Sequence, residues 1–184
     1  MPHGGLTLNA IENDASGPKK ETSSGAISGA TETAVAKSER ALPVLLTIHS
    51  EQDIDSPQQD DMELLTEGAM RVTPRGWTLT YQESALTGME GTTTTFEIEG
   101  PRVILRRVGN VTSQMIFEEG RQHTSLYETP FGELAVDIQT GYLRHSITES
   151  GGLLEIRYSV SVEHANTGRN RFRMKVRRAR TRAQ

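Results

Sequence analysis

The sequence contains no cysteine, which excludes disulfide bonds and thiolate metal sites. It also lacks a long apolar run, and no segment approaches the roughly 18 consecutive apolar residues that a membrane-spanning helix needs. The first residues, MPHGGLTLNAIENDAS, have no basic stretch followed by an apolar one, so they do not resemble a signal peptide. Together these absences predict a soluble protein of the cytoplasm.

Aromatic residues are few and unevenly placed. The chain has Trp 1, Tyr 4 and Phe 4, and all of them lie between Trp77 and Phe172. Residues 1–42 have none and are rich in Ala, Gly, Ser and Thr, a composition that buries too little apolar surface to offset the entropy lost on ordering. We therefore expect a flexible tail over residues 1–42, one domain over residues 43–176, and a flexible basic tail over residues 177–184.

Acidic residues are missing from the end of the chain. From Arg169 to Gln184 there are eight basic residues and no acidic one. Because the whole chain carries 20 − 24 = −4, residues 1–168 carry 12 − 24 = −12. An acidic body with a basic end can attract a second copy of the chain or a polyanion.

What the sequence does have is a long series of short alternating segments. In a strand, successive side chains point to opposite faces, so apolar residues at every second position create one buried face. The clearest case is residues 154–162, where Leu, Ile, Tyr and Val alternate with Glu, Arg and Ser. Turn residues separate the segments. The predicted strands are residues 43–50, 62–73, 77–83, 92–99, 102–108, 111–117, 122–128, 133–140, 142–148, 154–162 and 172–176.

This pattern predicts an all-β domain of about ten strands. Short turns favour a single antiparallel up-and-down β-barrel, because closure removes exposed strand edges. Gly68, inside a predicted strand, indicates a bulge or a sharp bend, and Gly141 is expected to separate two strands. No amphipathic helix is predicted in residues 43–176.

Residues 43–176 resemble the YwiB-like family of small bacterial proteins of unknown function. The motifs that carry the resemblance, in order, are Tyr81-x-Glu83, Gly88, Arg107-x-Gly109, Phe117-x-x-Gly120 and Tyr127-x-x-x-Phe131-Gly132-Glu133-Leu134. The resemblance implies a lipocalin-like, calycin-type β-barrel. It implies no catalytic residue, since the family has none assigned, and residues 1–42 look like an addition to the usual family length.

The interior of the predicted barrel is the first candidate site. Barrels of this size are either filled by their own side chains or enclose one small ligand, and both alternatives stay open. The aromatic candidates for a cavity lining, or for a filled core, are Trp77, Tyr81, Phe96 and Tyr127.

An arginine pair adds a polar candidate to the same interior. Arg106 and Arg107 are adjacent, so one of them can point inward. An inward arginine either binds a ligand carboxylate or forms a structural ion pair with Glu83 or Glu128 on a neighbouring strand. Arg107 matches the family pattern, which makes it the ligand-binding candidate of the two.

The basic end is the second candidate. Arg177, Arg178, Arg180 and Arg182 can bind the phosphates of a nucleic acid. However, no aromatic residues lie among them to stack on bases. The competing interpretation is a solubilising tail, or one that folds onto the acidic surface of another subunit.

No catalytic, cofactor or metal motif is found. The five histidines are scattered and lack the spacing of a zinc site. The acidic segment that follows residue 50 lacks the glycine and the closing glutamate of a calcium-binding loop. The sequence therefore predicts a non-enzymatic barrel without a cofactor that binds a small apolar or amphipathic molecule. The alternatives are a nucleic-acid accessory protein and a structural or homo-oligomeric protein with a solid core.

Overall fold

The alternating segments form ten antiparallel β-strands in the computed structural model. It describes residues 40–52, 54, 60–129, 132–162 and 165–179, and for residues 126–129, 132–134 and 165–167 it describes the backbone alone. The elements are β1 Leu42–Gln52, β2 Asp60–Thr73, β3 Gly76–Gln82, the 3-10 helix η1 Ala85–Thr87, β4 Thr92–Glu99, β5 Arg102–Gly109, β6 Ser113–Glu118, β7 Gln122–Thr129, β8 Gly132–His145, β9 Gly151–Val162 and β10 Ala165–Arg178.

The strands form one sheet with an up-and-down topology. Apart from β6 and β7, each strand pairs with its sequence neighbour, and β1 also pairs with β10, so the sheet order is β6-β5-β4-β3-β2-β1-β10-β9-β8-β7. The two ends of this order meet without a ladder: the Ser125 hydroxyl of β7 donates to the Gln114 carbonyl of β6 at 3.0 Å. The prediction of an all-β, single antiparallel up-and-down β-barrel is confirmed, and the structure shows that the barrel is nearly closed.

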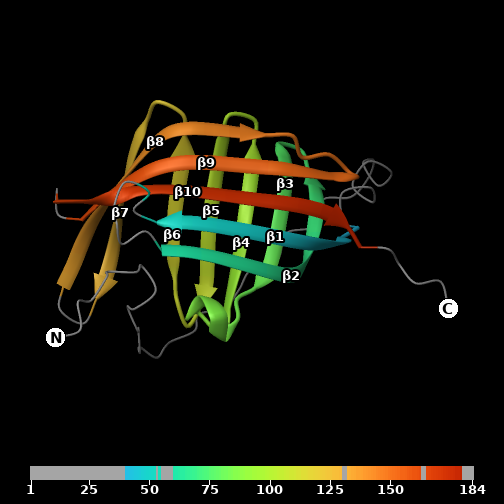
Figure 1. Cartoon of the computed structure of the whole chain (residues 1–184), viewed down its shortest axis with the longest axis horizontal. Helices are drawn as coiled ribbons and strands as arrows, with labels where there is room; N and C mark the ends of the chain where they lie inside the picture. The colour runs from blue at the N-terminus through green and yellow to red at the C-terminus, as the bar shows by residue number, and fades with distance from the viewer. Residues whose placement is uncertain (1–39, 53, 55–59, 130–131, 163–164, 180–184) are drawn as a thin grey trace, which may run out of the picture.

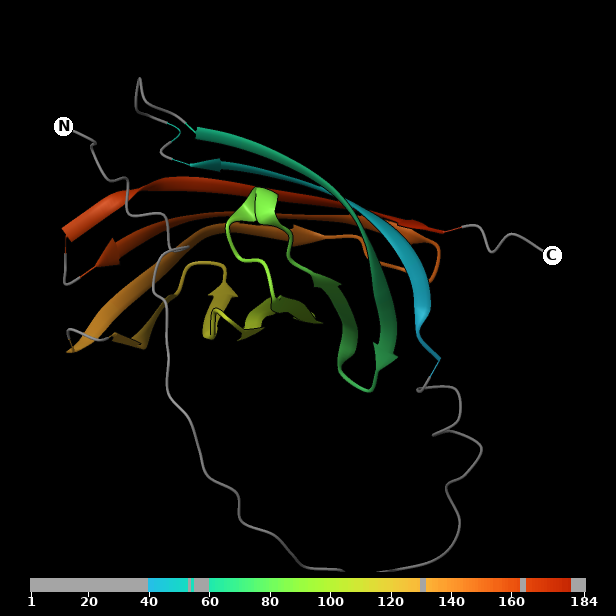
Figure 2. The same cartoon turned by 90° about the horizontal axis from the view of Figure 1, so that it is seen from below.

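The barrel has two groups of strands that cross each other. Figure 1 shows β8, β9, β10, β1 and β2 running across the page in front of β3, β4, β5 and β6, which run up and down. β2 links the groups, because residues 60–70 pair with β1 and residues 68–73 pair with β3, so that residues 68–70 pair with both. In Figure 2, β2 is the long green strand that curves from one group into the other.

Gly68 lies where β2 passes from one group to the other. It pairs with Val44 on one side and with Tyr81 on the other, and neither register is broken there. A Cβ at this position would lie 2.8 Å from the Thr80 carbonyl oxygen and 3.0 Å from a methyl of Leu46. Gly68 therefore accompanies a bend without a bulge, and its missing side chain makes room for Leu46.

The prediction that Gly141 separates two strands is wrong. β8 runs through Gly141 without a break, from Gly132 to His145. The register against β9 shifts between Thr140 and Tyr142, which is the mark of a β-bulge. One extra residue lets a long strand bend and keep its pairing, so a glycine at this point bends β8 without ending it.

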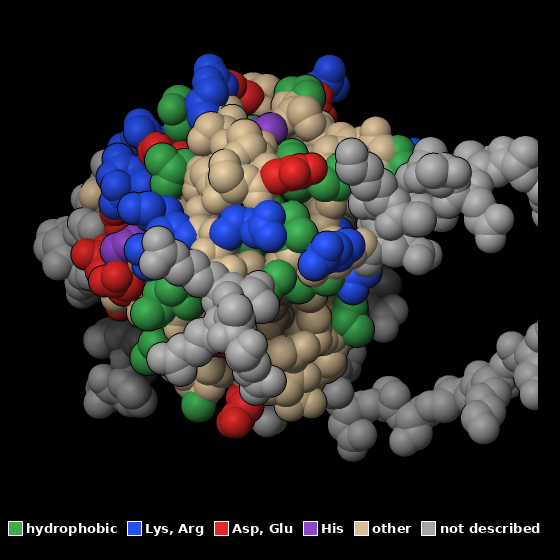
Figure 3. Space-filling view, turned by 90° about the vertical axis from the view of Figure 1, so that its right-hand side faces the viewer, with side chains coloured by type: hydrophobic (Ala, Val, Ile, Leu, Met, Phe, Trp, Pro, Cys, Tyr) green, Lys and Arg blue, Asp and Glu red, His purple; other side chains and the backbone are tan. Residues whose placement is uncertain are grey.

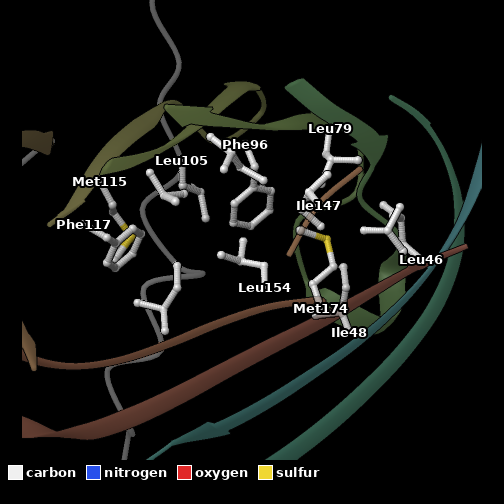
Figure 4. Close-up of a cluster of buried hydrophobic side chains, with 14 of the residues drawn as sticks. Leu46, Ile48, Leu79, Phe96, Leu105, Met115, Phe117, Ile147, Leu154 and Met174 are labelled. Atoms are coloured by element: carbon white, nitrogen blue, oxygen red, sulfur yellow. The ribbon is translucent and has the colours of Figure 1, made fainter. Parts of the chain in front are cut away.

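The core lies between the two groups of strands. Figure 4 shows apolar side chains from both groups pointing toward one another. Phe96 of β4 stacks on Phe172 of β10 with ring centroids 5.2 Å apart, which joins the groups directly. The largest side chains with almost no exposure are Phe96, Phe117, Leu46, Ile48, Met70, Leu79, Ile98, Ile138, Leu154, Ile156, Met174 and Val44.

Candidate functional site

One row of inward-facing side chains is polar, although the row next to it is apolar. The ladder pairs Tyr81 of β3 with Thr94 of β4, Thr94 with Arg107 of β5, and Arg107 with Ser113 of β6. Paired residues point to the same face of a sheet, so these four side chains form one line across four strands. The next inward row along the same strands is Leu79, Phe96, Leu105 and Met115, which is buried.

Glu83, the first residue after β3, also belongs to this row. Its backbone N–H donates to the Thr92 carbonyl at 2.9 Å, so the inward alternation of β3 continues past its last residue. The Glu83 side chain is only 6% exposed, and the Thr94 hydroxyl donates to its Oε1 atom at 2.5 Å. We call Tyr81, Glu83, Thr94, Arg107 and Ser113 the polar row.

Three buried atoms of the polar row have no hydrogen-bond partner within the described part of the chain. They are Glu83 Oε2, Arg107 Nε and Ser113 Oγ. Buried polar atoms in native proteins nearly always have a partner, and one left without it costs about 1–3 kcal/mol or more if charged. The row therefore combines an acceptor and two donors that are available to a water or a ligand.

The surroundings of the polar row change the pKa of the Tyr81 hydroxyl. Burial of the phenol and the nearby negative charge of Glu83 raise the pKa of Tyr81 well above its ordinary value, and the positive charge of Arg107 opposes this in part. The phenol therefore stays neutral and can donate a hydrogen bond at any physiological pH.

The segment between β3 and β4 lies at the same end of the barrel. In Figure 2 this segment, with η1, crosses the view near the centre of the molecule. The Thr87 hydroxyl donates to the Ser84 carbonyl at 2.9 Å, and Gly88 takes a left-handed conformation with φ of 69°. The side chain of Met89 is buried at 5% exposure. These features indicate an ordered segment next to the polar row.

We expect Tyr81 to resist ionisation near pH 10, where an ordinary tyrosine ionises. Because its pKa is raised in the folded state, its contribution to stability is present below about pH 10 and is lost as the pH rises from there toward the folded pKa. The tyrosinate absorbance of the folded protein near pH 10 should be the same in the wild type and in Tyr81→Phe. A drop of about half a tyrosine equivalent in the variant, which is the ionised fraction of an ordinary tyrosine at pH 10, would contradict the raised pKa.

The structure brings together part of the predicted ligand site. Tyr81 and Arg107 lie in the polar row, and Phe96 lies one row away. Trp77 lies on the inward face of β3 two residues before Leu79, on the side away from Tyr81, and is partly buried against the core. The side chain of Tyr127 lies outside the described residues, so its place in the site stays a prediction.

The arginine pair divides between the two faces of β5. Arg107 points inward, whereas the outward Arg106 binds Glu97 through its Nε atom at 2.8 Å. The sequence pattern does not single out Thr94 or Ser113, although the hairpin turn between β4 and β5 sets the register that aligns Thr94 with Arg107.

Two of the predicted basic residues are described. Arg177 and Arg178 are exposed at the end of β10, which continues through Arg178. Arg180 and Arg182 lie outside the described residues. Within the described residues, no group of three or more His, Asp or Glu side chains could hold a metal ion. No helix in the same part of the chain has the length and apolar character needed to cross a membrane.

Comparison with known proteins bears on the family and the fold. A family profile described as "Domain of unknown function (DUF1934)" matches residues 46–174. The crystal structure of the ywiB protein from Bacillus subtilis is similar, with a TM-score of 0.67 and 20% identity over 80% of this chain and 99% of that chain. Comparison with curated proteins gave no match. The matched profile spans most of the chain and the barrel agrees with the YwiB crystal structure, so the chain belongs to the DUF1934 family of YwiB-like β-barrel proteins.

Proposed function

We propose that this protein is a non-enzymatic binding protein that takes a small amphipathic molecule at the polar row. The observation that carries the proposal is that three buried atoms of this one row, Glu83 Oε2, Arg107 Nε and Ser113 Oγ, have no hydrogen-bond partner among the described residues. An acceptor and two donors on neighbouring strands match a ligand that itself has a hydrogen-bond donor and an acceptor.

The chemistry of the row narrows the ligand. The Arg107 guanidinium and the Ser113 hydroxyl can donate to a carboxylate or carbonyl oxygen of the ligand. Glu83 Oε2 can accept from a hydroxyl or an amine. The polar row borders the apolar interior, so the proposed ligand has an apolar part as well. Figure 4 shows side chains occupying the centre of the interior, which supports binding at the polar end rather than through the middle.

A structural role is the competing hypothesis for the row. Buried waters satisfy polar side chains in many proteins, typically with about three hydrogen bonds each. In that case the row would only stabilise the barrel. The two hypotheses differ in whether a molecule of more than solvent size is retained.

Native mass spectrometry of the full chain, purified from the cells that make it, tests the proposal. We expect a non-covalent adduct of small-molecule mass on the wild type, which is lost from Glu83→Gln and from Arg107→Met because each change alters one of the unpaired groups. Glu97→Gln is the matched control: Glu97 is a carboxylate on the adjacent strand β4 that binds Arg106 on the outward face. It should retain the adduct.

Two outcomes would reject ligand binding at the row. One is a wild-type spectrum with no adduct, and the other is an adduct retained equally by all the variants. The location in the cytoplasm, expected from the cysteine-free sequence, belongs to the same proposal and is tested by fractionating the producing cells.

Nucleic-acid binding through Arg177 and Arg178 stays a prediction.

A further inference from the structure

On the outward face of β2, β1, β10 and β9, acidic side chains line β2 and basic side chains line β10. This is the face turned toward the reader in Figure 1. Outward residues of β10 are Arg171, Arg173, Lys175 and Arg177, and outward residues of β2 are Asp61, Glu63, Leu65 and Glu67. β1 lies between them, so a basic strip and an acidic strip run side by side about 10 Å apart.

Both strips are paired toward the same end of the face, where Glu63 of β2 lies 3.6 Å from His49 of β1. Arg171 and Arg173 both bind Glu51 of β1, at 3.0 and 2.8 Å. Lys175, Arg177 and Glu67 have no ion pair within 4.0 Å among the described residues. Glu67 and Arg177 share a row, with Leu45 of β1 between them. At the other end of the face, one carboxylate and two cations therefore have no ion pair with any residue that the structure describes.

The same face carries two exposed leucines. Leu65 of β2 is 61% exposed and Leu153 of β9 is 56% exposed. They lie in one row, in which the order is Leu65, Thr47, Lys175 and Leu153. The methylene stem of Lys175 thus lies beside Leu153 in the same row. Arg173 and Arg177 occupy the rows on either side of it along β10.

Charge complementarity identifies the occupant of this face. Consider a two-fold axis that lies in the plane of contact and runs parallel to β1. It places β2 of one copy over β10 of the other, and residues of the same row in the two copies then face each other. Acidic and basic strips then meet twice. An axis perpendicular to β1 in the same plane would put each strip over its own kind, which is repulsive.

We propose that this face binds a second copy of the chain, with Glu67 of each copy opposite Arg177 of the other. Leu65 then packs on the Lys175 stem beside Leu153, and Leu45 lies close to the axis against its own counterpart. In Figure 3, which views the molecule from the right-hand side of Figure 1, Lys and Arg side chains gather at the margin on the side of this face.

The size of the face suits a dimer of moderate stability. Four strands at about 4.8 Å spacing and roughly ten residues at about 3.3 Å rise cover on the order of 600 Å² in projection. Stable interfaces bury about 800 Å² of accessible surface per partner. The accessible surface of this face is larger than its projected area, because side chains protrude from it, so it is close to that value. The charged contacts make the association sensitive to salt.

Charge reversal tests the proposal, with the mass of the full chain measured in solution by light scattering. We expect a wild-type mass of twice 20.3 kDa. Glu67→Arg and Arg177→Glu should each be monomeric, because either one creates like-charge contacts at both symmetric positions. An equimolar mixture of the two variants should dimerise. In the mixed dimer the arginine introduced in one chain faces the glutamate introduced in the other, and the two native side chains face each other at the second position.

A control variant separates the proposed contact from a general effect of changing charge. Glu90→Arg changes an exposed charge away from the face and should leave the dimer intact, and circular dichroism checks the folding of every variant. A monomeric wild type at a concentration on the order of 100 μM, single variants that still dimerise, or a mixture that stays monomeric would each overturn the proposal. So would salt-sensitive binding of a single-stranded oligonucleotide to a monomer through Lys175 and Arg177, which would assign the basic strip to nucleic acid.

Discussion

Replacing Phe96 with alanine should lower the free energy of unfolding by about 3–5 kcal/mol, the range found when a buried phenylalanine is truncated. Phe96 is 1% exposed. It pairs with Leu79 and Leu105 on either side within the sheet. Its ring also stacks on Phe172 of the crossing group of strands, so the change removes contacts that hold the two groups together.

Urea unfolding followed by circular dichroism measures this loss. For a chain of this size, about 3–5 kcal/mol corresponds to a fall in Tm of roughly 6–20 °C. Val108→Ala is the control, because Val108 is a β5 side chain with 64% exposure, and it should change stability by less than about 0.5 kcal/mol. A loss below about 1.5 kcal/mol for Phe96→Ala would mean that the interior is not tightly packed around this ring.

Replacing Gly109 with alanine should cost roughly 3 kcal/mol or more, because a strained backbone and a steric clash coincide there. Gly109 has φ of 135°, a conformation that side chains disfavour. An added Cβ would lie 2.2 Å from the Gly91 carbonyl oxygen and 3.0 Å from the Thr92 Cα atom. Both contacts are backbone, so neither can move aside easily.

The same change should disturb the polar row. Thr92 holds the Glu83 backbone through its carbonyl, and displacing it should move Glu83 away from Thr94. Gly100→Ala is the matched control, since Gly100 also has a positive φ of 59° but a Cβ there would meet nothing within 4 Å. It should cost only about 1–2 kcal/mol. If the two variants unfold at the same urea concentration, the clash at Gly109 is not the dominant effect.

The strand content of this chain is readable from alternation alone. Residues 154–162 alternate apolar and polar side chains, and the inward members Leu154, Ile156 and Val160 are buried as expected. Gly141 shows the limit of that reasoning. A glycine between two alternating segments indicates a turn or a bulge equally well, and only the continuous pairing of β8 with β9 distinguishes them.

The candidate site was predictable only in part. Tyr81, Glu83 and Arg107 could be singled out from the sequence, through the family resemblance and the presence of an adjacent arginine pair. Ser113 could not, because its place beside Arg107 depends on how the turn between β5 and β6 sets their register. A shift of one residue in the pairing of β6 with β5 would have turned Ser113 to the outside.

By itself, the sequence determined the all-β class, the inward and outward alternation of most strands, and the basic character of β10, because these follow from the period of side chains along a single strand. The tertiary structure decided which residues of different strands share a row. That decision places Arg107 beside Thr94 and Ser113 inside the barrel, and it places Glu67 two strands from Arg177 on the outside. Such neighbours arise from pairing between separate segments of the chain, and no local pattern encodes the register of that pairing.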